Sequence, residues 1–223
     1  MTTAEPKVLS VEYHVAKVHS IIVQMLCYYC VGVGVNLWAE SFALSVVGVF
    51  VSFGLIFALA FTVVEAYKKL YTSLFAFGFG LMTSVLVYEA YVVDPGIIIL
   101  AVVGTSLIFV TFTGVASYIP ASSNGILGGF LFVSLLVSIV ASVALLFFPE
   151  TTTANLIITW FTLIIFCGYI AYDTKEMYIR FGNPMAKHDH YHHAMNMFLN
   201  LINVFTKLLK LLQEQKKKKD KKN

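Results

Sequence analysis

The sequence predicts an all-α membrane protein whose helices cross the bilayer several times. Of the 223 residues, 59% are hydrophobic and only 12% are charged, proportions that are typical of polytopic membrane proteins and not of soluble domains. The chain also divides into apolar runs of about 20 residues, the length that is needed to cross the hydrocarbon core of a bilayer. No linker separates the runs, so we expect one compact helical bundle.

Short polar or proline-containing segments separate these runs. Asp94-Pro95 and Pro149-Glu150 each end a helix, because proline cannot continue the hydrogen-bond ladder. Residues 1–17 are polar and are expected to form a cytosolic N-terminal segment. The membrane domain covers residues 18–212, with predicted spans at 18–38, 42–64, 70–93, 97–118, 125–148, 154–172 and 191–212, and a lysine-rich tail follows at 213–223.

The charges between the spans indicate an orientation. If the N-terminus is cytosolic, all lysines and arginines before the last span lie on the cytosolic side. The only charged residues in the opposite loops are then acidic. Loops rich in lysine and arginine generally stay in the cytosol, so we predict a cytosolic N-terminus. The residues on the two sides are Lys7, Lys17, Lys68, Lys69, Lys175, Arg180 and Lys187 against Glu40, Asp94 and Glu150.

The last span carries a narrow polar stripe along an otherwise apolar helix. At 100° per residue, its members fall within an arc of roughly 80°. Amides that face lipid would lack hydrogen-bond partners at a high cost in free energy. We therefore predict a bundle of six helices around this central seventh helix, with the stripe turned toward Asp173 or water. The stripe consists of His192, Asn196, Asn200, Asn203, Lys207, Lys210 and Glu214.

The tail is harder to place. Seven full crossings would leave the tail opposite the N-terminus, yet Lys219 and Lys221 match a K-x-K-x-x retrieval signal, which is read from the cytosol. A re-entrant last helix would reconcile the two predictions, and a translocated tail is the alternative. Its six lysines at 216–222 are also a plausible contact for anionic lipid, at about 1 kcal/mol per lysine near the surface.

Asp173 is the leading candidate for a functional side chain. A carboxyl group at the end of a span, near a polar helix, suggests a functional site. The alternative is structural: Asp173-Thr174-Lys175-Glu176 matches a capping box that would start a short cytosolic helix. The sequence alone does not decide between these two interpretations.

Other polar groups are weaker candidates. Glu89, inside the third span, is either an interfacial glutamate or a cation contact at the luminal mouth. The histidines form a solvated loop or a pH sensor, and their spacing matches no zinc motif. Gly32, Gly34, Gly78, Gly80, Gly104 and the pair Gly125 and Gly129 are predicted to allow close helix packing. The histidines are His188, His190, His192 and His193.

No enzyme active site is apparent, and no cofactor, metal or nucleic acid is expected. Intramembrane aspartyl proteolysis needs two aspartates, but the spans supply only Asp173. A seven-helix receptor is an alternative by span count, although the short loops and the polar last helix argue against it.

Two C-terminal motifs and the lysine tail resemble the transmembrane BAX-inhibitor-motif family, on its Bax inhibitor-1 branch. The motifs are Phe166-Cys-Gly-Tyr169 with Tyr172-Asp173-Thr174, and Phe198-Leu-Asn200-Leu-Ile-Asn203-Val-Phe205. The resemblance implies six helices around a seventh in the endoplasmic reticulum membrane, a passive pH-sensitive calcium leak, and suppression of cell death. It also implies a second aspartate where this chain has Asn200, which cannot ionise.

Two functional hypotheses follow from the resemblance and the residues. In the first, the protein is a calcium leak, with Asp173 as the gate or ion-contacting carboxylate and Asn196, Asn200 and Asn203 as the facing polar wall. In the second, it is a non-conducting membrane adaptor that binds anti-apoptotic or calcium-channel proteins through its lysine tail.

Overall fold

A computed structural model describes residues 11–145, 147, 152–181 and 189–221. These residues form seven α-helices and one short 3₁₀ helix, and contain no strand. All seven α-helices are long and apolar enough to cross a membrane, which confirms the predicted all-α polytopic membrane fold. The elements are α1 (Val11–Ala39), α2 (Phe42–Phe61), α3 (Glu65–Val93), α4 (Gly96–Val115), η1 (Ala116–Tyr118), α5 (Ala121–Ala144), α6 (Thr152–Phe181) and α7 (His190–Asp220).

Two of the breaks between helices carry a side-chain hydrogen bond to the backbone. The Ser41 side chain accepts a hydrogen bond from the Leu44 N–H at the start of α2, as N-terminal caps do. At the predicted Asp94-Pro95 break, α3 ends and the Asp94 carboxylate accepts a hydrogen bond of 2.8 Å from the N–H of Gly96.

Several helices extend beyond the apolar runs. Helix α1 already begins at Val11, α6 continues past the predicted end of its span to Phe181, and α7 continues through most of the predicted tail to Asp220. Once a helix has formed, each further residue adds a hydrogen bond without a new nucleation cost. The apolar runs therefore locate the membrane-crossing parts and not the ends of the helices.

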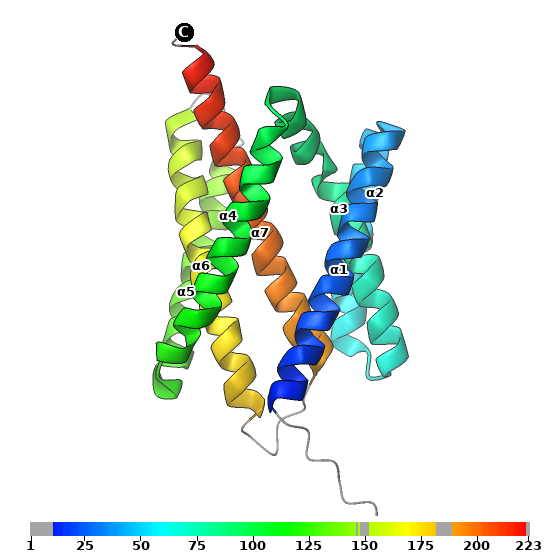
Figure 1. Cartoon of the computed structure of the whole chain (residues 1–223), viewed down its shortest axis with the longest axis vertical. Coiled ribbons are helices and arrows are strands. Elements are labelled where there is room, and N and C mark those ends of the chain that lie inside the picture. The colour runs from blue at the N-terminus through cyan, green and yellow to red at the C-terminus, as the bar shows by residue number, and fades with distance from the viewer. Residues whose placement is uncertain (1–10, 146, 148–151, 182–188, 222–223) are drawn as a thin grey trace, which may run out of the picture.

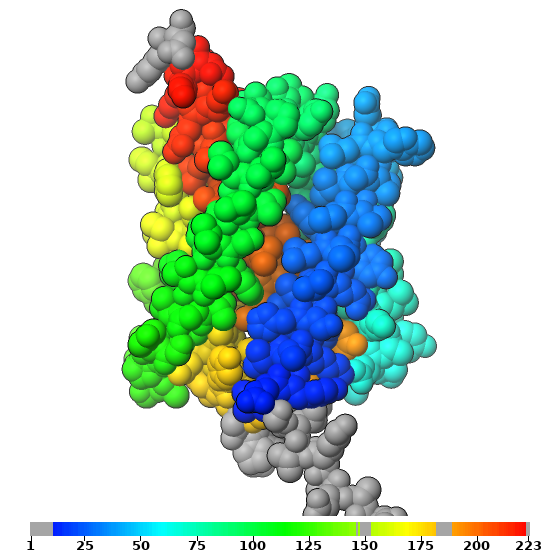
Figure 2. Space-filling view, in the orientation of Figure 1, coloured from blue at the N-terminus to red at the C-terminus, as the bar shows by residue number. Residues whose placement is uncertain are grey.

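Helix α7 lies between two groups of helices, as Figure 1 shows. One group contains α1, α2 and α3, the other contains α4, α5 and α6, and α7 crosses between them from its orange start to its red end. Its neighbours are α1, α3, α4 and α6, whereas α2 packs mainly against α3, and α5 against α6. In Figure 2, orange atoms of α7 are visible between α1 and α4. The last helix is thus central, as predicted, and two of the six surrounding helices are attached to it indirectly.

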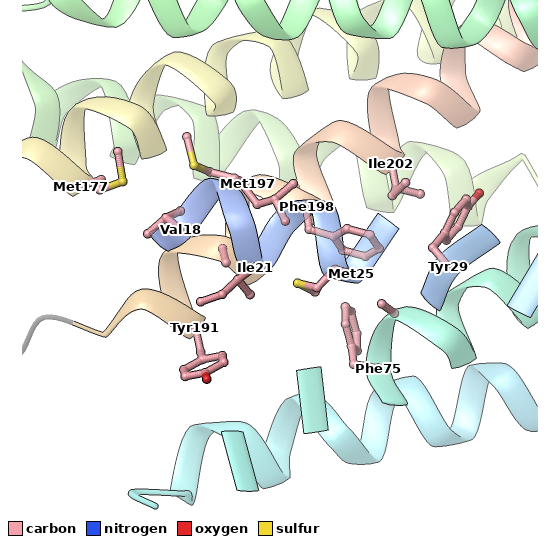
Figure 3. Close-up of a cluster of buried hydrophobic side chains, with 13 residues drawn as sticks. Val18, Ile21, Met25, Tyr29, Phe75, Met177, Tyr191, Met197, Phe198 and Ile202 are labelled. Atoms are coloured by element: carbon pink, nitrogen blue, oxygen red, sulfur yellow. The ribbon is translucent and has the colours of Figure 1, made fainter. Parts of the chain in front are cut away.

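Three buried clusters show why α7 holds the bundle together. In the first, Phe198 of α7 packs among α1 and α3 side chains, including Met25 and Phe75 (Figure 3). In the second, Phe205 of α7 contacts α3 and α4. In the third, Val204 of α7 lies against α6. Helix α7 contributes to every cluster, so its apolar faces connect the two groups.

Some glycines allow helices to approach closely. A Cβ atom on Gly32 would lie 2.2 Å from the carbonyl oxygen of Phe77, and one on Gly80 would lie 2.2 Å from that of Tyr29. Such contacts are typical of membrane helices that associate through small residues. Gly78 also has close neighbours in α2, and Gly104 approaches Leu208.

The prediction that three other glycines allow close helix packing is wrong. Nothing lies within 4 Å of a Cβ built on Gly34, Gly125 or Gly129. In α5 the close approach is instead made by Gly128, where a Cβ would lie 2.6 Å from the Tyr172 ring. The i, i+4 spacing of Gly125 and Gly129 gives the right helix but the wrong face.

Helix α7 runs through the bundle as one continuous helix. Its 31 residues correspond to about 46 Å at 1.5 Å per residue, and it does not turn back as a re-entrant helix would. The start of α1 and the end of α7 lie at opposite ends of the bundle (Figure 1). With seven crossings, a cytosolic N-terminus and a cytosolic retrieval signal at Lys219 and Lys221 exclude each other.

Candidate functional site

Asp173 lies within α6, two turns before the helix ends at Phe181. The helix passes through Asp173 without a break, so the interpretation of Asp173-Thr174-Lys175-Glu176 as a capping box is wrong. Glu176 instead accepts a hydrogen bond of 2.8 Å from Asn124 at the start of α5 and pairs with Arg180 at 2.7 Å. Asp173 is 9% exposed, and such a buried carboxylate requires a polar partner.

Asn200 of α7 is that partner. Its amide Nδ2 donates a hydrogen bond of 2.5 Å to Oδ2 of Asp173, and its side chain is also buried. A hydrogen bond to a carboxylate is shorter and stronger than one between neutral groups. The polar stripe therefore faces the bundle at this level, with Asn200 against Asp173, as the sequence predicted. The functional role of the pair stays a prediction.

A cavity of about 700 Å³ opens beside this pair, walled by α5, α6 and α7. Because α5 packs mainly against α6, space remains between α5 and α7. Asn196, Asn203 and Lys207 of the α7 stripe line this cavity together with Asp173 and Asn200. The Asn203 amide also donates 2.8 Å to the carbonyl of Leu199 in its own helix. The three candidate amides thus share one cavity with the candidate carboxylate.

Three serine and threonine hydroxyl groups add to the polar lining, and they were not predicted from the sequence. Ser138 and Ser142 of α5 and Thr162 of α6 line the cavity, and each hydroxyl donates to a carbonyl of its own helix, at 2.7 to 2.9 Å. Their oxygens therefore retain acceptor capacity toward the cavity. Ser134, Ser138 and Ser142 recur every four residues, so this polar face of α5 could have been found from its helical period.

Apart from Lys207, the oxygen atoms of this lining suit a hard cation. Carboxylate and amide carbonyl oxygens are among the ligands that calcium prefers. Among the described residues, however, no group of three or more histidine, cysteine, aspartate or glutamate side chains could hold a metal ion. Within the ranges that the structure describes, the arrangement is that of an open polar cavity and not of a tight metal centre.

The C-terminal end of the α7 stripe makes ion pairs and does not line the cavity. Lys210 and Glu214 are not among the cavity-lining residues, and Glu214 pairs with Lys217 at 3.5 Å. Two residues after Glu214, Lys216 pairs with Asp94 at 3.3 Å. The end of α7 is thus attached to the turn between α3 and α4.

Glu89 lies outside the cavity. Its side chain is exposed on α3, and it is not among the residues that line the Asp173 cavity. A role as a cation contact at a mouth of the bundle stays a prediction. Lys219 and Lys221, the proposed retrieval residues, are exposed at the end of α7.

Two of the candidate histidines join a buried cluster with a residue that the sequence did not single out. The His14 ring, at the start of α1, lies 4.3 Å from the ring of His190 and 5.6 Å from that of His193, centroid to centroid. His14 and His193 are buried, whereas His192 is exposed. His188 lies outside the described residues. Along α7, the cluster ends three residues before Asn196, the first residue of this helix that lines the Asp173 cavity.

Two carboxylates outside the membrane-spanning helices have lowered pKa values. The Gly96 N–H and then Lys216 hold the pKa of Asp94 below its ordinary value. For Asp189, burial alone would raise the pKa, but hydrogen bonds from Lys68 and from the N–H groups of His192 and Tyr191 outweigh it and lower the pKa. Asp189 caps α7, so its charge lies at the positive end of the helix dipole.

Comparison with known proteins gives a consistent picture. Residues 11–217 match the profile of the family described as "Inhibitor of apoptosis-promoting Bax1". The chain is 30% identical to "Probable Bax inhibitor 1" of Paralichthys olivaceus over 219 residues, which cover 96% of this chain and 91% of that protein. It is also 34% identical to "Bax inhibitor 1" of Homo sapiens over 137 residues, or 58% of this chain and about half (54%) of the human protein. "Bax inhibitor 1" of Oryza sativa subsp. japonica is 30% identical over 136 residues, 56% of this chain and 53% of that protein. The family profile matches nearly the whole chain, and the structure has a helix with a buried polar stripe at the centre of a seven-helix bundle. We conclude that the protein belongs to the Bax inhibitor-1 family.

Proposed function

We propose that this protein is a passive calcium leak of the endoplasmic reticulum membrane and that it contributes to the suppression of apoptosis. The observation that carries the proposal is the Asp173–Asn200 contact beside a cavity of about 700 Å³. Ionisable groups inside membrane proteins are costly and usually mark ion pathways. The family relationship supports the same role.

In this proposal Asp173 is the carboxylate that contacts the ion. Asn196, Asn200 and Asn203 form the opposite wall, and the hydroxyl groups of Ser138, Ser142 and Thr162 supply further oxygen atoms. These groups replace part of the hydration shell of a passing cation, as polar linings do in channels. The ion binds weakly at each position, so it can also leave.

The proposal is tested with purified protein in liposomes that contain a calcium indicator. Calcium uptake that exceeds that of protein-free liposomes, and that rises with the amount of protein, is the expected result. Uptake equal to that of protein-free liposomes would contradict the leak function.

A second candidate function is that of a non-conducting adaptor. Lys217, Lys218 and Lys219 are exposed on the last turns of α7, where they are available to acidic partner proteins or anionic lipids. Replacing these three lysines with glutamine would then reduce binding to vesicles that contain anionic lipid, with neutral vesicles as the control. Loss of vesicle binding without any calcium uptake by the native protein would favour the adaptor.

A further inference from the structure

Lys207 introduces a positive charge into the cavity beside Asp173. Among the described residues that line this cavity, Lys207 is the only lysine or arginine and Asp173 is the only aspartate or glutamate. The Lys207 side chain is partly buried. A lysine inside a membrane protein is costly, so its presence in a polar cavity requires an explanation.

The nearby acidic residues do not neutralise Lys207. In the described part of the chain, no carboxylate lies within ion-pair distance of its ammonium group, and Glu214 is paired with Lys217. Asp173 contacts Asn200, seven residues before Lys207 on α7. Seven residues correspond to about 10.5 Å along a helix axis. The cavity therefore carries a negative charge near one end and a positive charge near the other.

This arrangement determines how the cavity responds to ions. With both groups ionised, its net charge is zero, so the attraction of Asp173 for a cation is offset by the repulsion from Lys207. Charges act strongly in a narrow cavity with low-dielectric walls. The repulsion by Lys207 and the attraction by Asp173 are both twice as large for a divalent cation as for a monovalent one, so removing the Lys207 charge affects a divalent cation most. We infer that Lys207 is the charge-selecting residue of the cavity and that its ammonium group restricts the access of cations, divalent cations most of all.

The electrostatic claim can be tested without any transport measurement. Cys27, Cys30 and Cys167 are first replaced by alanine, and Ser142→Cys then introduces a thiol into the wall of the cavity. The rates of thiol modification in detergent are measured with a cationic, an anionic and a neutral methanethiosulfonate reagent. The neutral reagent corrects for differences in access.

We expect Lys207→Gln to raise the ratio of the cationic to the anionic rate at least tenfold. Lys210→Gln removes a lysine from the same helix but outside the cavity, and should change the ratio less than twofold. Lys207→Arg keeps the charge and should leave the ratio unchanged. An unchanged ratio in Lys207→Gln, an equal change in Lys210→Gln, or a thiol that none of the reagents modifies would each overturn the inference.

The consequence for calcium rests on the proposed leak function. In liposomes, Lys207→Gln should increase calcium uptake at least fivefold, with a smaller increase for potassium, whereas Lys210→Gln should not. If the thiol rates change as expected but neither the native protein nor the variant takes up calcium, the leak function fails and the charge selection stands. If the native protein takes up calcium but the thiol rates do not respond, the charge selection fails and the leak function stands.

Discussion

The amide of Asn200 lies 2.5 Å from the carboxylate of Asp173 and joins α7 to α6 beside a polar cavity. An amide can donate a hydrogen bond to the ionised carboxylate and can accept one from the protonated form. Asp173 therefore keeps its partner in either protonation state. Two carboxylates at this position would behave differently, because they would share a proton at low pH and repel each other after losing it.

The first prediction concerns the variant Asn200→Asp. It should make calcium uptake depend more steeply on pH between 6 and 8 than in the native protein, because each pKa unit of coupling is worth roughly 1.4 kcal/mol of gating energy. The steepness is measured as calcium uptake into liposomes at several pH values. Asn203→Asp, which adds a carboxylate to the cavity away from Asp173, is the control and should have a smaller effect. A native pH response as steep as that of Asn200→Asp would contradict the prediction and direct attention to His14, His190 and His193.

A second prediction concerns the contact between α1 and α3. Gly32→Ala would place a methyl group 2.2 Å from the Phe77 carbonyl oxygen, so the helices must separate, at a cost of about 1–3 kcal/mol for overpacking. Gly34→Ala, two residues away, meets nothing within 4 Å and should be neutral or slightly stabilising, because alanine favours a helix over glycine. Unfolding in detergent compares the two variants. Equal stabilities would show that α1 and α3 do not pack at Gly32.

A third prediction concerns Asp189, whose pKa is lowered by Lys68 and by the first N–H groups of α7. The ionised carboxylate stabilises the folded state, so its contribution is complete above the unfolded pKa of about 3.9. This contribution is lost as the pH falls through the lower pKa of the folded state. Asp189→Asn should reduce the melting temperature by the same amount at pH 7 and pH 5, and the difference should shrink below the unfolded pKa and disappear once the pH is below the lowered pKa of the folded state. Asparagine keeps the cap, so the variant removes mainly the charge. A difference that remains at low pH would show that the charge is not the cause.

A fourth prediction concerns topology. Cysteines introduced by Ser41→Cys and Lys218→Cys lie at one end of the bundle and should be labelled from the same side of the membrane, whereas Ser122→Cys should be labelled from the other. The positive charges near the N-terminus predict that Ser122→Cys is labelled from the cytosol. Cytosolic labelling of Lys218→Cys would reverse this orientation and restore the retrieval signal at Lys219 and Lys221.

The sequence predicted those features that depend on a single helix. The period of the α7 stripe placed Asn196, Asn200 and Asn203 on one face, and the cost of lipid-facing amides turned that face inward. The sequence also predicted Asp173 as the partner of this face, because Asp173 is the acidic residue at the end of the preceding span. Local chemistry and the membrane determined the inward face, whereas the specific pairing of Asn200 with Asp173 rested also on the resemblance to the family.

Other features that depend on how helices meet were not predictable. Asp173-Thr174-Lys175-Glu176 has the residues of a capping box, but α6 continues through it and Glu176 binds Asn124 of α5 instead. His14 joins the histidine cluster only because the start of α1 packs against the start of α7. Likewise, Gly128 and not Gly125 or Gly129 makes the close contact in α5, because the position of Tyr172 decides which face is covered.

The central claim is that cations pass the Asp173 carboxylate, and calcium uptake by the Asp173→Asn variant tests it most directly. The variant removes the only negative charge among the described cavity-lining residues but keeps a side chain that can hydrogen-bond to Asn200, so the fold should persist. Glu12→Gln removes a carboxylate from the exposed start of α1 and serves as the control. We predict that Asp173→Asn lowers calcium uptake into liposomes at least tenfold while Glu12→Gln leaves it unchanged. Native uptake by a folded Asp173→Asn variant would contradict the account.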